Sequence, residues 1–215
     1  MAANRTPGQR AGLTRQSVLE AALRLVDQEG LKSLSMRRLG TELGVEAMTL
    51  YHHVPNKIAL LDGVIEQVVA EAVPPEFGAA TWRENLSAYA HALIAALGAH
   101  PNTVPLLLSR PAMTPRLLGT MEGVVGMLYE AGFALPRTLD VAYSLTSFVV
   151  GHAVAQVGNV GGADSMVSLD PNTYPLLVGA ARAMGEDAAR ARFDFALEAL
   201  LSGFERELAL TPPAK

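Results

Sequence analysis

The sequence of 215 residues contains no cysteine. The chain therefore forms neither disulfide bonds nor thiolate metal sites. It also lacks an HExxH motif, a P-loop, a dinucleotide-binding glycine pattern and a Ser-His-Asp order. No residues stand out as candidates for enzyme chemistry, and neither a cofactor nor a metal is predicted. The first twelve residues lack the apolar segment of a secretory signal, so we expect a cytoplasmic protein.

Long alternating stretches typical of β-strands are also missing, and the sequence predicts an all-α fold. One apolar run, Leu139 to Val157, approaches the length of a membrane span. It contains Asp140, His152 and Gln156, which are costly in hydrocarbon. A buried helix at a subunit interface explains this run better than a membrane span does.

Charge is distributed unevenly along the chain, although the net charge is only −4. Residues 1–60 contain eight basic and five acidic side chains, whereas the remainder contains nine basic and sixteen acidic ones. Half of all residues are hydrophobic, which is enough for a proper core. This asymmetry favours an N-terminal nucleic-acid module attached to an acidic body.

Two short helices with a glycine between them are predicted within Ser35 to Lys57. Met36, Leu39 and Leu43 have the i, i+3, i+7 spacing of one helix face. Gly44 follows at once and can take the positive φ that ends a helix. Residues 46–52 are long enough for about two further turns. The pattern is that of a helix-turn-helix, whose second helix can enter a DNA major groove.

The segments before this element predict an arm and a first helix. Residues 1–12 are small and polar, and we expect a flexible arm, either a disordered tail or a basic arm that touches DNA phosphates or the minor groove. Thr14 is a candidate N-cap for a helix that Gly30 ends, and Ser35 is a candidate N-cap for the next helix. Together with the helix-turn-helix, these segments form a three-helix bundle.

A connecting helix is predicted next, over residues 57–73. Val54-Pro55 breaks the chain, Asn56 can cap the new helix, and Pro74-Pro75 stops it. The apolar stripe expected to face the core consists of Ile58, Leu61, Ile65 and Val68.

The rest of the chain reads as a helical body. Helices are predicted at residues 82–99, 115–131, 136–157, 174–184 and 188–208, with a short piece at 106–108 and a mobile loop at 158–172. The helices at 136–157 and 188–208 are apolar on more than one face, which favours burial against symmetry mates in a four-helix dimer interface. Gly151, Ala153 and Ala155 would allow close approach there.

The segment Leu13 to Val64, and above all LGVEAMTLYHHVPNKIALLD, resembles the TetR family of bacterial transcriptional repressors. TWRENL and the segment from Tyr129 to Gly151 resemble the body of the tetracycline repressor class. The resemblance implies an arm (1–12), a helix-turn-helix DNA-binding domain (13–56), a connecting helix (57–73) and a ligand-binding and dimerisation domain (74–215). It further implies a homodimer on a pseudo-palindromic DNA operator that is released by a small-molecule effector.

The resemblance also implies DNA contacts. Arg37 matches the family arginine that reads a guanine, and Lys57 matches a phosphate-binding lysine. The remaining implied contacts are Ala47, Met48 and Thr49 at the start of the recognition helix, and Tyr51, His52 and His53 near its end. His52-His53 could instead be a metal site, but adjacent helical residues point about 100° apart and no acidic partner is suitably spaced.

On the ligand side the sequence departs from the tetracycline repressor class. The Arg110-Pro111 pair is present, but Leu106 replaces the histidine that holds drug-bound magnesium. Ala155 replaces a glutamate and Tyr89 an asparagine, so we expect a small, mostly apolar effector other than tetracycline–Mg²⁺. Candidate pocket residues are Trp82, Tyr89, Leu93, His100, Leu106, Met121, Phe133, Phe148 and His152.

Alternatives remain at this stage. His91, His100 and His152 could be ordinary surface and core histidines and not part of a pocket. The chain could be a helical enzyme or scaffold, or a DNA-binding regulator whose body only dimerises and takes no inducer.

Overall fold

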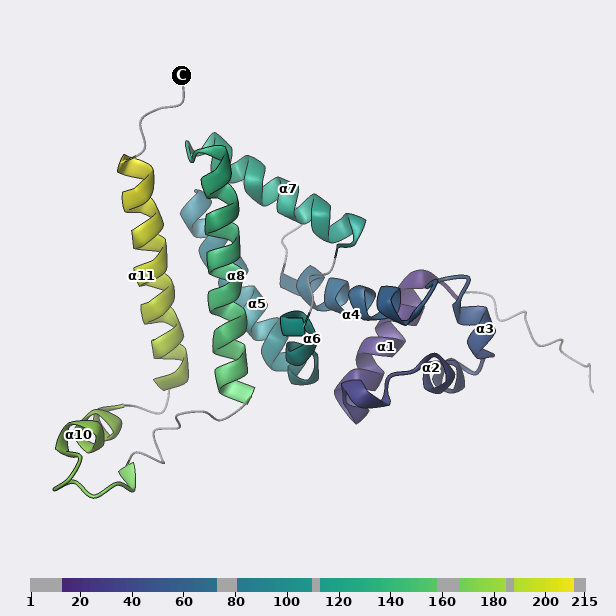
Figure 1. The fold of residues 1–215 in the computed structure, drawn as a ribbon, viewed down its shortest axis with the longest axis horizontal. Coiled ribbons are helices and arrows are strands. Elements are labelled where there is room, and N and C mark those ends of the chain that lie inside the picture. Colours follow the sequence, from purple (N-terminus) through teal and green to yellow (C-terminus); the bar gives the residue numbers. More distant parts are fainter. Residues whose placement is uncertain (1–12, 73–80, 110–112, 158–166, 185–187, 211–215) are drawn as a thin grey trace, which may run out of the picture. The chain divides into compact units, whose positions relative to one another are not determined.

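The computed structural model describes residues 13–72, 81–109, 113–157, 167–184 and 188–210 (Figure 1). These residues form helices and turns without a strand, so the all-α prediction is confirmed. The predicted arm at 1–12, the Arg110-Pro111 pair and most of the predicted loop at 158–172 lie outside the described residues. The chain divides into two compact units, Met1–Pro74 with Ala95–Met121, and Pro75–Ile94 with Glu122–Lys215.

The N-terminal part of the first unit consists of four helices and a short 3₁₀ turn. They are α1 (Arg15–Glu29), the turn η1 (Leu31–Ser33), α2 (Met36–Leu43), α3 (Ala47–Leu50) and α4 (Lys57–Ala72).

The predicted helix caps are confirmed in this part of the chain. The Thr14 hydroxyl accepts a hydrogen bond from the Ser17 amide, and the Thr14 amide donates back to the Ser17 hydroxyl. Ser35 Oγ accepts from the Arg38 amide at 3.1 Å, and Asn56 Oδ1 accepts from the Ala59 amide at 2.8 Å. Each cap satisfies an amide that the first helical turn leaves unpaired, and so fixes where the helix starts.

The core of this unit lies where α1 packs against α4. A Cβ atom built on Gly63 would lie 2.3 Å from Leu19 Cδ2, so glycine permits the close approach of the two helices. The predicted stripe of α4 is wrong in part, because Ile58 is 57% exposed. The fully buried face consists instead of Leu60, Val64 and Val68, which are spaced by four residues.

A second stretch of chain completes the first unit. The end of α5 (Trp82–Ala99) leads into the 3₁₀ turn η2 (Pro101–Thr103), α6 (Val104–Ser109) and the start of α7 (Pro115–Glu130). Helix α6 is longer than the predicted piece at 106–108, because Pro105 lies in its first turn, where a missing amide hydrogen costs no hydrogen bond. The predicted cap at Thr114 is present, with the Leu117 amide donating to Thr114 Oγ1 at 3.3 Å.

The second unit contains the first part of α5, the end of α7, α8 (Leu135–Val157), α10 (Pro175–Ala183) and α11 (Ala188–Leu210). Helices α8 and α11 run side by side (Figure 1). Leu145 and Val149 of α8 and Leu197 and Leu201 of α11 are buried. Gly132 ends α7 with a φ of 103°, a conformation that favours glycine.

Membrane-spanning potential is limited to one bent pair of helices. Across the described ranges no single helix passes a length and hydropathy test for a span. The segments Trp82–Ala99 and Pro101–Ser109 are long and apolar enough only when taken together, and the chain bends by 96° between them. The apolar run at 139–157 does not pass.

Candidate DNA-binding and effector sites

The turn between α2 and α3 is fixed by two glycines. Gly44 has a φ of 63° and a ψ of 35°, the left-handed conformation that ends α2. The Val45 amide then donates to the Gly40 carbonyl at 2.9 Å. A Cβ atom at Gly40 would lie 2.9 Å from the Val45 carbonyl oxygen and 3.2 Å from the Ala47 nitrogen. Gly40 therefore sets how closely the start of α3 approaches α2.

Helix α3 is shorter than the two turns predicted for residues 46–52. Only Ala47–Leu50 is α-helical, and the amides of Tyr51 and His52 bond three residues back, to Met48 and Thr49. The amides of His53 and Val54 both bond to the Leu50 carbonyl at 2.9 Å, so the segment ends just before Pro55. Leu50 and Val54 are buried and hold this segment on the core.

The side chains predicted to contact DNA differ in exposure. Met48 is 69% exposed and Tyr51 is 42% exposed, whereas Leu50 between them is fully buried. Arg37, His52 and Lys57 are also exposed, whereas Ala47, Thr49 and His53 are half-buried. These residues come from α2, from α3 and the turn that follows it, and from the start of α4, and they include both basic and apolar side chains. We call this set the reading surface: Arg37, Ala47, Met48, Thr49, Tyr51, His52, His53 and Lys57.

Two adjacent arginines in α2 have different surroundings. Arg38 is paired, with Nε 3.1 Å from Glu29 Oε1 and Nη1 3.0 Å from Glu42 Oε2. The hydrogen bonds with Glu29 and Glu42 raise the pKa of Arg38 above its ordinary value. Arg37 is exposed, and within the described ranges no acidic side chain pairs with it. Of the two arginines, Arg37 is the one available to a ligand.

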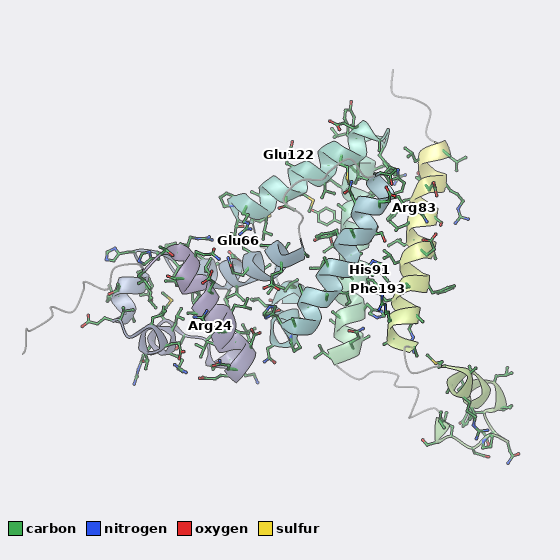
Figure 2. All side chains as sticks on the ribbon, turned by 180° about the vertical axis from the view of Figure 1, so that it is seen from behind. Arg24, Glu66, Arg83, His91, Glu122 and Phe193 are labelled. Carbon is green, nitrogen blue, oxygen red and sulfur yellow. The ribbon has the colours of Figure 1, made fainter. Side chains whose placement is uncertain are left out.

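A polar cluster joins α4 to α1 and to the start of α7. Both Glu66 carboxylate oxygens accept hydrogen bonds from Arg15, at 2.9 and 3.2 Å, and the Glu66 side chain is almost fully buried. Burial favours a higher pKa for Glu66, but the hydrogen bonds from Arg15 and Thr114 and the Arg15 charge outweigh it and lower the pKa. Gln16 and Gln67 pair beside this cluster at 2.8 Å. Glu66 is marked on α4 in Figure 2.

The nine predicted pocket residues fall into both units. Three belong to the first unit: His100, Leu106 and Met121. Leu106 is buried in α6, so an apolar side chain lies at the position where the resemblance to the tetracycline repressor class implies a metal ligand. His100 contacts two carboxylates, with Nδ1 2.8 Å from Asp27 Oδ2 and Nε2 3.2 Å from Glu71 Oε1.

The other six lie in the second unit, where aromatic rings gather around Phe193 of α11. Phe148 stacks on Phe193 with a centroid distance of 5.2 Å, and His152 meets the same ring edge-on at 5.1 Å. The ring of His91, on α5, has its centroid 5.5 Å from that of Phe193. Both residues are labelled in Figure 2. Sequence reasoning missed Phe193 as a member of this group, which we call the Phe193 cluster.

A second aromatic pair and a buried hydroxyl complete the candidates in this unit. Trp82 and Phe133 form a T-shaped pair with centroids 5.2 Å apart. Burial raises the pKa of Tyr89, and a hydrogen bond with Thr146 partly offsets this rise. Leu93 is fully buried.

His152 has a polar atom that the described residues leave unsatisfied. Its Nε2 is buried and has no hydrogen-bond partner among them. Burial lowers the pKa of His152, the Arg192 charge lowers it further, and a backbone hydrogen bond at Ala189 opposes both. The neutral ring therefore presents a buried nitrogen that could bond a polar group of a ligand.

In the portion of the chain that the structure describes, no three His, Asp or Glu side chains are arranged to hold a metal ion.

Comparison with known proteins assigns the chain to a family. The family described as "Bacterial regulatory proteins, tetR family" matches residues 18–64, and the "Tetracyclin repressor-like, C-terminal domain" matches residues 74–208. The chain belongs to the tetR family. It is a transcription regulator of this family with a tetracycline-repressor-like C-terminal domain.

Individual tetR-family relatives resemble it over much of their length. The tetracycline repressor protein class D of Escherichia coli is 32% identical over 92% of each chain. The transcriptional repressor DrrR1 of Streptomyces coeruleorubidus is 35% identical over 70% of this chain, a match that spans 56% of DrrR1. Among solved structures, apo ActR of Streptomyces coelicolor has a TM-score of 0.77 at 27% identity and covers 96% of this chain and 99% of its own. ActR has also been solved in complex with actinorhodin, at 29% identity to this chain.

Replacing Gly40 with alanine tests the α2–α3 approach. We expect Gly40→Ala to weaken operator binding more than it changes thermal stability, because the new methyl group would push Val45 and the start of α3 away from α2. Operator DNA can be obtained by selecting random-sequence DNA on the parent protein, and affinity is measured by fluorescence anisotropy beside a thermal melt.

Gly179→Ala in α10 is the matched control, because a Cβ atom there meets nothing within 4 Å. It should leave affinity unchanged and favour the helix by up to about 1 kcal/mol. Equal affinity of Gly40→Ala and the parent would show that Gly40 does not set the position of α3.

Proposed function

We propose that the chain binds a pseudo-palindromic operator as a homodimer and leaves it when a small, mostly apolar aromatic effector binds the body. The observation that carries the DNA-binding part is the reading surface, whose exposed side chains project from a segment held by the buried Leu50 and Val54. Rigid support of a few exposed side chains is what a helix-turn-helix needs to read bases.

Within this proposal the reading surface divides into base and backbone contacts. Arg37 reads a guanine, since it is exposed while its neighbour Arg38 is held by acids. Ala47, Met48 and Thr49 offer mainly apolar contacts, which suit thymine methyl groups. Tyr51, His52, His53 and Lys57 contact phosphate and sugar, and so position the protein without choosing the sequence.

Homodimer formation is supported by the exposed surfaces of α8 and α11. On α11, Phe195 is 78% and Leu210 is 80% exposed, and Ala199 lies four residues after Phe195. On α8, Tyr143 is 61% exposed and Gly151 is exposed eight residues later. Large exposed apolar side chains on a pair of neighbouring helices favour burial against a second copy. Ala153, expected at the same interface, is instead buried within the subunit.

The effector proposal depends on the Phe193 cluster and on His152. Stacked aromatic rings suit a planar aromatic molecule, and the unsatisfied Nε2 of His152 suits a hydroxyl or amide group on it. ActR, which has been solved with actinorhodin bound, supports the same class of compound. Tetracycline–Mg²⁺ is disfavoured, although tetracycline repressors are relatives, because the buried Leu106 cannot ligate magnesium.

Effector binding would act through α4 on the spacing of the two reading surfaces. An effector releases the operator only if it binds the two states of the dimer with different affinities. Helix α4 starts at Lys57 in the reading surface and is joined to α7 at Glu66, so a shift of the α7 start would reach it. We further propose that the chain acts in the cytoplasm and has no catalytic role, in line with relatives named as regulators.

Removing the Arg37 side chain should weaken the parent operator specifically. Arg37→Ala removes a bidentate contact with guanine, which is worth about 1–3 kcal/mol. Affinity for the parent operator should therefore fall roughly 5- to 150-fold. Arg182→Ala, which removes an exposed arginine of α10, serves as the charge-matched control. If both variants lose affinity equally, Arg37 contributes only charge and the assignment fails.

A charge placed on the exposed face of α11 should prevent dimer formation. Phe195→Glu is expected to yield monomers at micromolar concentration in sedimentation equilibrium, since the buried carboxylates would remain unpaired. The same change at Leu108, which is 59% exposed in α6, should leave the dimer intact. A dimeric Phe195→Glu protein would exclude this face from the interface.

Planar aromatic compounds should raise the melting temperature of the parent, because a ligand at one hundred times its Kd stabilises by about 2.7 kcal/mol. His152→Phe should keep the apolar bulk and lose most of the stabilisation by hydroxylated compounds. Tyr129→Phe, at an exposed position in α7, is the control. Tetracycline with Mg²⁺ is included in the panel, and stabilisation by it alone would overturn the effector proposal.

A further inference from the structure

The corner between α5 and α6 reaches the helices of the DNA-binding part through two side chains. His100 follows α5 and places Nδ1 2.8 Å from Asp27 Oδ2 of α1 and Nε2 3.2 Å from Glu71 Oε1 of α4. The Asn102 amide donates to the carbonyl oxygens of Val26 and Asp27, at 3.1 Å each. Residues 100–102 therefore contact the C-terminal ends of both α1 and α4.

Both ring nitrogens of His100 face carboxyl oxygens. When these carboxyl groups are ionised, their oxygens accept hydrogen bonds and cannot donate them. A neutral imidazole has one N–H and satisfies one of these contacts, whereas the doubly protonated ring satisfies both. The charged groups that face the ring are Asp27 from α1 and Glu71 from α4, and Asn102 of η2 is a neutral donor nearby. The negative end of the α1 dipole also favours a positive charge here.

The two contacts of His100 are not equivalent. The Asp27 side chain is 28% exposed and the Glu71 side chain 49% exposed, and the Glu71 contact is the longer one. When the ring loses a proton, the remaining N–H on Nδ1 retains the shorter, more buried contact with Asp27. The Glu71 carboxylate then faces the lone pair of Nε2, loses its hydrogen bond with the ring and can bond to water instead.

We propose that doubly protonated His100 is a positioning residue that ties the C-terminal end of α4 to α1, and that loss of its charge releases α4 at this point. The tied form holds one more proton than the released form, so falling pH favours it and rising pH weakens it. Histidine is the side chain whose ordinary charge change lies between about pH 5 and 8, which sets the pH range of the test. If α4 relays effector binding, as the proposed function has it, operator release becomes pH-dependent.

The test uses the free, full-length protein and needs neither DNA nor effector. Nitrogen-15 NMR of the imidazole should show both His100 nitrogens protonated at pH 6. Hydrogen exchange, corrected for its intrinsic pH dependence, should show the last turn of α4 losing protection roughly tenfold from pH 6 to pH 8. That is the size expected for one hydrogen bond to a charged group. The end of α1 should keep its protection, since the Asp27 contact and the Asn102 bonds remain.

His100→Gln should abolish the pH response of α4. Glu71→Gln should do the same while leaving His100 on Asp27, and it tests the proposal even if His100→Gln fails to fold. His91→Gln is the matched control, because His91 also has both nitrogens near acceptors, Ser87 O at 2.8 Å and Asp194 Oδ1 at 2.9 Å, but lies in the second unit. A pH response of α4 that persists in Glu71→Gln, or a singly protonated His100 at pH 6, would overturn the proposal.

The last arm measures operator release at pH 6 and pH 8 in the parent and in Glu71→Gln. A difference in the parent alone would support the link to induction. Equal pH dependence in both proteins would overturn that link. Failure to bind any DNA would refute the proposed function and leave the NMR and exchange results valid.

Discussion

The close packing of α1 against α4 is the constraint on which the first unit depends. Leu19 lies against Gly63, where any side chain on α4 would collide with the Leu19 side chain. Beside this contact, Glu66 is buried and compensated by two hydrogen bonds from Arg15. An unpaired carboxylate at this place would cost several kcal/mol, so burial of Glu66 requires that α1 keep its position. The orientation of α1 relative to α4 thereby depends on an apolar and an ionic contact together.

Much of the local structure could be predicted from the sequence because it depends on neighbouring residues. Thr14, Ser35 and Asn56 cap the helices as expected, and Gly44 takes its expected left-handed conformation. A cap or a glycine turn involves residues within about four positions, so its chemistry is visible in the sequence. Gly40 also had a visible signal, since an isolated glycine inside a helix often marks close packing.

Features set by contacts between distant segments could not be predicted in the same way. The exposed Ile58 and the buried Leu60 differ by two positions in a helix that is apolar nearly throughout, so only the packing partner selects the face. The pairing of Arg38 with Glu29, and of His100 with Asp27, joins residues that no periodicity links. The candidate effector residues show the same limit, because Phe193 meets Phe148 and His91 only after three helices have packed together.

The brevity of α3 has an evolutionary consequence. A single helical turn has little stability of its own, and this one is held in place by Leu50 and Val54. Met48, which projects away from that support, can change without disturbing the core, as can its half-buried neighbours Ala47 and Thr49. With the base contacts proposed for these positions, point mutation there would give a duplicated gene a new target site while both copies still fold. Divergence of target preference between such copies would then precede any divergence of their fold.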